Sequence, residues 1–267
     1  MSNAYRPPVP YIKTNAEVIA LEKACRIVAE TFNTIAKYMK PGVSTLLLDK
    51  IAEDYILSQN AKPAFKGYKV DRKSFPATLC ISINEEVVHG IPSERQLQEG
   101  DIVSVDCGAE YNGYFGDSAV TYAIGAIDRE KQMLMKVTEE ALFKGIEQAI
   151  DGNKLYDISR AIQSHAESNG FSLTRELVGH GIGKELHEEP AVPNFLPPLL
   201  HRKRYPNVKL QKNMAIAIEP MVHAGRQQVK TLSDGWTYVT ADGSPAAHFE
   251  HTVIIDKGKA NILTLRD

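Results

Sequence analysis

Five side chains of metal-binding type are spread along this chain from residue 106 onward, each beside a short apolar run or a cluster of glycines. They are Asp106, Asp117, His180, Glu219 and Glu250. Four carboxylates and one imidazole form a mostly oxygen-donor set of the kind that divalent metal ions bind. Because four carboxylates carry more negative charge than one divalent ion neutralises, the set predicts a centre that holds two metal ions.

The two aspartates give the strongest local argument. An Asn-Gly pair at 112–113 separates two strand-like runs, which is a strong hairpin signal. With these two residues as the loop, counting outward places Asp106 on the first strand opposite Ala119 on the second. Asp117 lies two residues from Ala119 on that second strand. The carboxylates then share one face as diagonal neighbours, about 7–8 Å apart at the backbone, which suits metal ions about 3.5–4 Å apart. The alternative is a pair of solvated acids beside a turn.

The other three candidates stand in contexts that surface residues seldom occupy. Glu219 ends the apolar run 214–218, and Glu250 precedes the apolar run 252–255, so both should be attached to buried segments. A buried carboxylate without a partner is unfavourable. His180 lies among three glycines, which allow a close approach of the backbone to a ligand or a positive φ. Taken alone, His180 is more simply interpreted as a turn histidine.

A centre of this kind predicts peptide hydrolysis. Divalent ions lower the pKa of bound water toward neutrality and polarise a carbonyl group. An exopeptidase must also recognise a free chain end, and an unprotonated α-amino group can coordinate one of the metal ions.

The order and spacing of the motifs resemble those of the methionine aminopeptidases, type 1 and bacterial-like. The motifs are Ile81-Ser82-Ile83-Asn84-Glu85, Val88-His89-Gly90-Ile91-Pro92, Asp106 with Asp117, Gly179-His180-Gly181-Ile182-Gly183, His187-Glu188-Glu189-Pro190, Ile218-Glu219-Pro220-Met221 and Glu250-His251-Thr252. The resemblance extends from about residue 12 to the C-terminus. It implies the α+β pita-bread (creatinase/aminopeptidase) fold, with two pseudo-symmetric halves and an antiparallel sheet covered by helices.

The resemblance also implies roles. The metal ligands would be Asp106, Asp117, His180, Glu219 and Glu250, and the ions would be Co, Mn, Fe or Zn. Asp117 and Glu250 would bridge the two ions, and Glu219 would also carry the proton from water to the leaving amine. His187 would hydrogen-bond the scissile carbonyl, and His89 would contact the backbone nitrogen at the cleaved bond. As isolated residues, these two histidines are equally well interpreted as a loop residue and a turn residue.

The positions that match the family's methionine pocket are Phe65, Tyr68, Cys80 and Trp236. Each of them could instead serve core packing, which is the commoner use of such side chains. The chain has Leu186 where many family members place an aromatic residue, and the segment 69–74 is longer than in compact bacterial members.

The stretch 190–208 is also longer than in a minimal enzyme and is expected to be an exposed loop, because it is rich in proline. Its basic run at 201–204 is interpreted as solvated, with a transient contact to ribosomal RNA as the alternative.

Composition is typical of a compact globular enzyme. The chain has 267 residues, of which 43% are hydrophobic and 24% charged, so we expect one catalytic domain over 13–267 and a flexible N-terminal arm over 1–12. A net charge of -2 gives no broad field for nucleic acid or an anionic membrane. Three widely spaced cysteines favour a reducing compartment, the cytoplasm. The N-terminus lacks the apolar core of a signal peptide, no stretch is long enough to span a membrane, and nothing requires more than a monomer.

Helical periodicity predicts helices over about 14–39, 45–60, 129–150 and 155–169, with Thr14 and Glu17 as a capping box. Gly42 and Gly152 break the two helix pairs at corresponding places. This repetition suggests an ancient duplication, and hence two similar α+β halves.

The resemblance implies an enzyme that removes the initiator methionine from nascent polypeptides, preferably when the second residue is small. The alternatives are an X-Pro dipeptidase or aminopeptidase P-like enzyme, which normally carries a large extra N-terminal domain, and a non-catalytic binding paralogue, which should have lost a ligand. A dipeptidase uses a similar metal set on the same fold.

Overall fold

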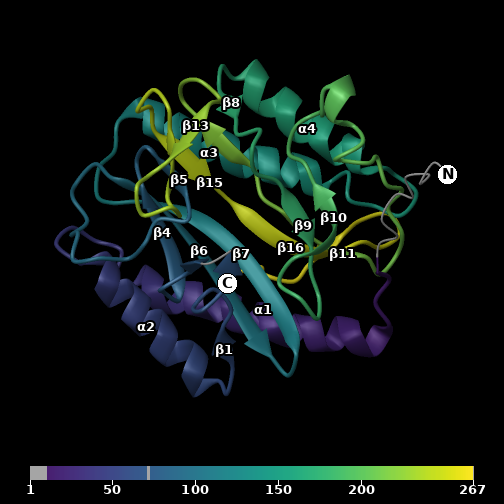
Figure 1. The fold of residues 1–267 in the computed structure, drawn as a ribbon, viewed down its shortest axis with the longest axis horizontal. Helices are drawn as coiled ribbons and strands as arrows, with labels where there is room; N and C mark the ends of the chain where they lie inside the picture. Colours follow the sequence, from purple (N-terminus) through teal and green to yellow (C-terminus); the bar gives the residue numbers. More distant parts are fainter. Residues whose placement is uncertain (1–10, 71–72, 267) are drawn as a thin grey trace.

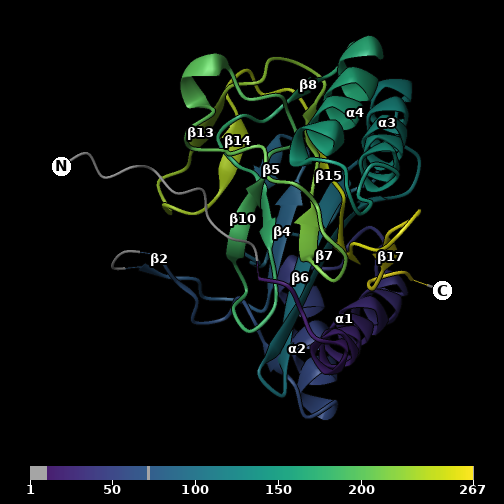
Figure 2. The same cartoon turned by 90° about the vertical axis from the view of Figure 1, so that its right-hand side faces the viewer.

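The computed structural model describes residues 11–70 and 73–266, and these form two pairs of helices packed on an antiparallel sheet (Figure 1). The helices are α1 (Asn15–Ala36), α2 (Thr45–Ser58), α3 (Arg129–Ile146) and α4 (Leu155–Ser168). Figure 2 shows the two pairs one above the other, with strands β2 (Lys69–Val70), β10 (Glu188–Val192) and β13 (Val229–Thr231) toward the opposite side. The predicted pita-bread fold of class α+β is confirmed.

The helices begin where the sequence predicts and end earlier in two cases. Thr14 and Glu17 form the expected capping box at the start of α1. We predicted that the first helix reaches residue 39 and the third reaches residue 150. Instead, the chain leaves the α-helix in turns with three-residue spacing, such as the bond from Ala149 N to Ile146 O of 3.0 Å, and Ile150 then forms a parallel bridge. Apolar periodicity continues through such a turn, so it does not mark the helix end.

The two halves repeat one local arrangement. After α1, Gly42 N donates a hydrogen bond of 2.8 Å to Leu97 O, and after α3, Gly152 N donates one of 3.0 Å to Leu210 O. Both glycines have a positive φ, +86° and +98°, which residues with a Cβ seldom adopt. Each glycine therefore turns the chain toward the second helix of its pair in the same way.

The main sheet joins the halves. Its strand order is β1-β6-β7-β16-β11-β9-β10, with β4 also paired to β6 and β17 to β16. The strands are β1 (Lys62–Pro63), β4 (Leu79–Ile83), β6 (Ile102–Tyr111), β7 (Tyr114–Ala123), β9 (Gly179–Gly181), β11 (Ala215–Ile218), β16 (Glu250–Ile254) and β17 (Asn261–Ile262). Because β7 and β16 are neighbours, the first half meets the second at the middle of this sheet.

Smaller sheets complete the structure. One contains β8 (Ser172–Leu173), β12 (Met221–His223) and β15 (Ala246–His248), a second contains β5 (Glu86–Val88), β13 and β14 (Tyr238–Thr240), and a third pairs β2 with β3 (Lys73–Ser74). A short 3-10 turn, η1, spans Leu199–His201.

The two largest apolar clusters among the described residues lie one beneath each helix pair. Phe32 and Leu48 pack with Val103 under the first pair, and Ile158 packs with Ile216 under the second. Burial of these side chains stabilises the sheet on its helical side, and the opposite side is left for polar groups that converge between the halves.

Of the predicted arm 1–12, residues 1–10 lie outside the described residues, and Ile12 forms a bridge with Met214. Within the described part of the chain, no helix combines the length and the apolar character needed to cross a lipid bilayer.

Candidate metal centre and adjoining cavity

The hairpin of β6 and β7 has the register predicted from its Asn-Gly loop. Asp106 pairs with Ala119 and Asp117 pairs with Gly108, so the two carboxylates are diagonal neighbours on one face. The loop residue Asn112 has a φ of +51°, which asparagine tolerates better than most residues.

Strand β16 brings the third carboxylate beside this hairpin. Glu250 pairs with Ala119 on β7. Two hydroxyl groups tie the strands together reciprocally: Ser118 Oγ donates to Glu250 O at 2.6 Å, and Thr252 Oγ1 donates to Asp117 O at 2.7 Å. Sequence reasoning missed Ser118 and Thr252, although both are hydroxyl residues next to a predicted ligand.

His180 enters the site from β9, where its flanking glycines permit close strand contacts. A Cβ on Gly179 would lie 2.4 Å from Ala217 O, and one on Gly181 would lie 2.4 Å from Glu189 O. The close approach that we expected toward a ligand is thus made to neighbouring strands. His180 Nδ1 lies 2.9 Å from Gly181 O. Because a carbonyl oxygen can only accept, Nδ1 carries the ring proton and donates a hydrogen bond to this oxygen. Nε2 is left with a free lone pair.

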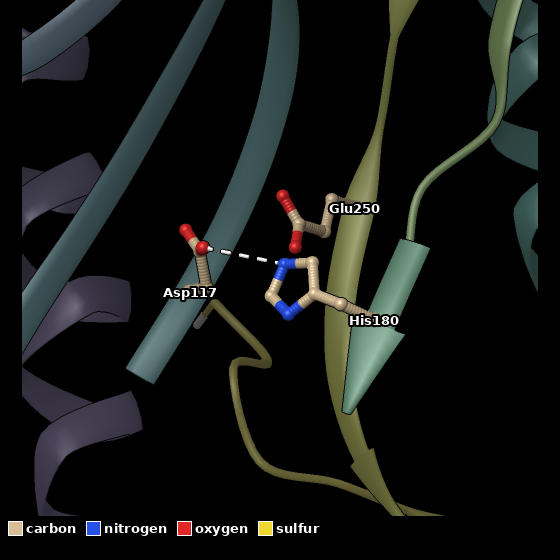
Figure 3. Close-up of side chains that lie close together, drawn as sticks. All are labelled: Asp117, His180 and Glu250. Atoms are coloured by element: carbon tan, nitrogen blue, oxygen red, sulfur yellow. Dashed lines mark ion pairs between the residues drawn. The ribbon is translucent and has the colours of Figure 1, made fainter. Parts of the chain in front are cut away.

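That lone pair faces carboxylates. His180 Nε2 lies 3.8 Å from Asp117 Oδ2 and 3.7 Å from Glu219 Oε1. One ligand atom each from Asp117, His180 and Glu250 lie within 4.8 Å of one another, as Figure 3 shows for the three side chains. Asp106 lines the same cavity. The structure therefore brings all five predicted ligands together.

The hydrogen bonding and the pKa values of the carboxyl groups show whether this site suits a cation. Among the described residues, three buried carboxylate oxygens lack a hydrogen-bond partner, namely Asp106 Oδ1, Asp117 Oδ1 and Glu250 Oε1. Burial raises the pKa of Asp117 well above its usual range, and neighbouring carboxylates add to the shift. The pKa values of Glu219 and Glu250 are raised for the same two reasons. Clustered carboxylates with unsatisfied oxygens are the environment that divalent cations neutralise.

The candidate metal ligands line a cavity of about 240 Å³. Every residue that the sequence analysis assigned to the site lines it, including Phe65, Tyr68, Cys80 and Trp236. Residues that we did not predict also line it, namely Val70, Phe75 and Leu186. Most of the apolar lining residues, Phe65, Phe75, Cys80, Leu186 and Trp236, belong to one apolar cluster. The cavity therefore combines carboxylates with an apolar wall.

Two histidines border this cavity. His89 has a φ of +59°, an uncommon backbone conformation for a residue with a side chain. The next residue must be glycine, because a Cβ on Gly90 would lie 2.1 Å from Ile81 O. His187 is exposed at the mouth, with its ring centroid 4.4 Å from that of His180.

Two further polar residues contact Glu219. Asn194 Nδ2 donates a hydrogen bond of 3.0 Å to Glu219 O. His248 is buried with its Nε2 3.8 Å from Glu219 Oε2, and that nitrogen has no hydrogen-bond partner in the described part of the chain. Sequence reasoning missed both, because no motif beside Asn194 or His248 indicates a contact with Glu219.

The stretch 190–208 is only partly the exposed loop that we predicted. Leu199 and Leu200 are 76% and 91% exposed, and the basic run at 201–204 is exposed. Phe195 and Tyr205 are buried, however, and their rings pack together, so aromatic anchors fix the loop on both sides of its tip.

A carboxylate-rich centre at the junction of two similar α+β halves defines a metallopeptidase of the pita-bread class. Residues 20–257 match the sequence model of the family described as Metallopeptidase family M24. A member of this family is expected to use a divalent metal ion for hydrolysis.

Within this family, the chain is 54% identical to a methionine aminopeptidase of Clostridium acetobutylicum over 95% of this chain and 98% of that protein. The crystal structure of a methionine aminopeptidase from Thermotoga maritima superposes with a TM-score of 0.90 at 43% identity, covering 97% of this chain and 100% of that one. The chain belongs to the methionine aminopeptidases of family M24.

The prolidase of Pyrococcus furiosus also superposes, with a TM-score of 0.76 at 23% identity, over 96% of this chain and 66% of the prolidase. At that identity the likeness shows a shared fold alone. The X-Pro dipeptidase alternative is therefore not favoured.

Proposed function

We propose that this protein hydrolyses the peptide bond after the N-terminal methionine of nascent polypeptides, with two divalent ions of Mn, Fe, Co or Zn and with a preference for a small second residue. The observation that carries the proposal is the single cavity in which a carboxylate-rich centre adjoins an apolar wall. An apolar wall suits a thioether side chain, and a metal centre next to it suits the amide bond that follows.

Asp106, Asp117, His180, Glu219 and Glu250 would hold the ions, with Asp117 and Glu250 contributing to both. When bound, the ions would lower the pKa of the attacking water and polarise the scissile carbonyl.

Glu219 moves the proton. Its carboxylate accepts a proton from the attacking water and passes it to the leaving amine nitrogen, as general acid-base catalysis requires. The bond from Asn194 to Glu219 O supports this role, because it fixes the backbone from which the carboxylate projects.

His187 and His89 orient the peptide. His187 donates a hydrogen bond to the oxygen of the scissile carbonyl, where negative charge develops. His89 contacts the backbone nitrogen at the cleaved bond. Because His187 stands at the mouth, the second residue of the substrate passes close to it, which supports the preference for a small side chain there.

The methionine side chain occupies the wall formed by Phe65, Tyr68, Cys80 and Trp236. Phe75 supports this wall, since its ring packs edge-on against that of Trp236 at 5.3 Å between centroids. Leu186 lines the same wall.

The test is release of free methionine from the peptides Met-Ala-Ser and Met-Lys-Ser, by metal-free protein and by protein restored with each metal ion separately. We expect no release without metal, release from Met-Ala-Ser with at least one metal, and much slower release from Met-Lys-Ser. Release from neither peptide with any metal would contradict the proposal. Cleavage of X-Pro peptides instead would support the dipeptidase alternative.

We also propose the cytoplasm as the compartment and a monomer as the working form, with nascent chains as the partner. The three cysteines, Cys25, Cys80 and Cys107, are free and buried, as a reducing compartment favours. The exposed basic run at 201–204 supports a transient contact with ribosomal RNA, because phosphate groups attract such clusters.

A further inference from the structure

The hydroxyl group of Tyr68 faces His187. Tyr68 Oη lies 2.7 Å from His187 Nδ1, and the two rings meet edge-on with centroids 5.2 Å apart. This distance is that of a good hydrogen bond. It joins a residue of the apolar wall to a histidine that contacts the substrate.

Backbone pairing holds Tyr68 in place. Phe75 N donates to Tyr68 O at 2.8 Å, and Tyr68 N donates to Phe65 O at 2.9 Å. The Phe75 ring is in turn packed on Trp236. The tyrosine hydroxyl is therefore fixed by the same segment that builds the apolar wall.

His187 has few other restraints. Its ring contacts the ring of His180, and within the described residues no other group hydrogen-bonds to it. An exposed imidazole held by ring contacts alone would turn about its side-chain bonds and present either nitrogen to the cavity. The Tyr68 hydroxyl removes this freedom.

We propose that Tyr68 is a positioning residue that fixes both the orientation and the tautomer of His187. The hydroxyl donates a hydrogen bond to an unprotonated Nδ1, so the ring proton resides on Nε2. From there Nε2–H donates to the carbonyl oxygen of the substrate. This inference rests on the role of His187 in the proposed function.

The neighbouring His180 shows the opposite arrangement. Its Nδ1 faces the carbonyl oxygen of Gly181, an acceptor only, so its proton resides on Nδ1 and Nε2 keeps a lone pair for a metal ion. At His187 the group facing Nδ1 is a hydroxyl that can donate. The group that faces Nδ1 thus sets the tautomer of each histidine. His180 keeps a lone pair on Nε2 for a metal ion, and His187 keeps a proton on Nε2 for donation.

The first experiment compares Tyr68→Phe with the unaltered protein, both restored with metal, on Met-Ala-Ser. Phenylalanine keeps the ring in the wall and deletes only the hydroxyl. We expect kcat to fall about five- to tenfold, as loss of one hydrogen bond implies, with KM changing less than about twofold.

The matched control is Tyr238→Phe. The ring of Tyr238 packs edge-on against His89 at 5.7 Å between centroids, and no hydrogen bond joins them within the described residues. We expect this variant to retain kcat. Equal loss in the two variants would overturn the proposal.

The second experiment reads the tautomer directly by nitrogen NMR of histidine-labelled, zinc-loaded protein, with the His187 resonances assigned by His187→Gln. We expect an unprotonated Nδ1 that accepts a hydrogen bond, and in Tyr68→Phe a shift of this resonance toward that of a free lone pair. A protonated Nδ1 in the unaltered protein, or an Nδ1 resonance that does not move in Tyr68→Phe, would overturn the inference. If no metal gives methionine release, the proposed function fails, and the NMR result still decides the role of Tyr68.

Discussion

Lys13 and Glu188, 175 positions apart, form an ion pair in which the Lys13 side chain is buried, and Glu188 directly follows His187 in the chain. The Lys13 side chain is only 1% exposed and that of Glu188 is 16% exposed. The other oxygen of Glu188 accepts from the backbone of Lys184 at 2.7 Å and of Glu185 at 3.3 Å. The pair therefore ties the first described residues to the loop that ends at His187.

Lys13→Met should weaken both stability and catalysis. Removing one partner leaves the Glu188 carboxylate without its buried cation, so we expect the free energy of unfolding to fall by about 3 kcal/mol. We expect kcat to fall as well, because the loop before His187 is loosened. Urea unfolding and methionine release measure the two effects.

An exposed ion pair supplies the control for this variant. Lys62, which is 77% exposed, pairs with Glu110 at 2.8 Å. Lys62→Met should change the free energy of unfolding by less than about 1 kcal/mol. A loss in Lys13→Met no larger than that in Lys62→Met would show that the buried pair does not stabilise the loop.

Glu219→Gln should abolish most activity while the fold is retained. Glutamine keeps the shape of the side chain and cannot accept the proton of the attacking water, so we expect kcat to fall about 10²- to 10⁴-fold at saturating metal. Methionine release at increasing metal concentration separates this effect from weaker metal binding. Glu94→Gln, at an exposed residue, is the matched control, and an activity of Glu219→Gln equal to that of Glu94→Gln would exclude the proton-carrying role.

Glu250→Gln should have opposite effects on stability with and without metal. Burial raises the pKa of Glu250, and the Asp117 carboxylate adds to the shift. Because the folded-state pKa is raised, the stability that protonated Glu250 contributes is fully present below the unfolded-state pKa. This stability is lost as the pH rises through the folded-state pKa. Near neutral pH the metal-free variant should therefore be the more stable protein, by about 1–3 kcal/mol.

Metal reverses the order, because an ion that binds only the folded state adds to its stability. With saturating zinc, the free energy of unfolding should increase more for the unaltered protein than for Glu250→Gln. Thermal unfolding with and without zinc, near pH 5 and near pH 8, tests both halves of this prediction. A metal-free variant that is less stable than the unaltered protein near pH 8 would contradict it.

His223→Gln tests a buried histidine on β12. Its imidazole lies between the Thr174 hydroxyl at 2.7 Å and Arg226 O at 2.9 Å, and burial lowers its pKa below the usual 6.5. The stability that neutral His223 contributes is thus present above the unfolded-state pKa of 6.5. It is lost as the pH falls from there through the lower folded-state pKa. The unaltered protein should exceed the variant in unfolding free energy near pH 7.5, and the difference should narrow toward about pH 5.5. A difference in unfolding free energy that is the same at the two pH values would contradict this prediction.

Much of the site follows from local sequence. The Asn-Gly loop fixed the register of β6 and β7, and so placed Asp106 and Asp117 on one face. The capping box at Thr14 likewise fixed the start of α1. These signals act within a few residues, which is why they can be read from amino-acid order.

Other features depend on neighbours that are distant in the chain. The glycines beside His180 are required by Ala217 O and Glu189 O, and no local pattern names those partners. The ends of α1 and α3 were misjudged because turn bonds and a bridge to Asp256 replaced the helical pattern.

Amino-acid order alone was enough to predict the types of the candidate ligands, their order and the strands that carry them, since alternation and turn chemistry are properties of short segments. The folded chain was needed to show that β16 lies beside β7, that Lys13 reaches Glu188 and that the Tyr68 hydroxyl faces His187. Such contacts depend on the order of strands in the sheet and on the packing of both halves, which set distances between residues that no short segment contains.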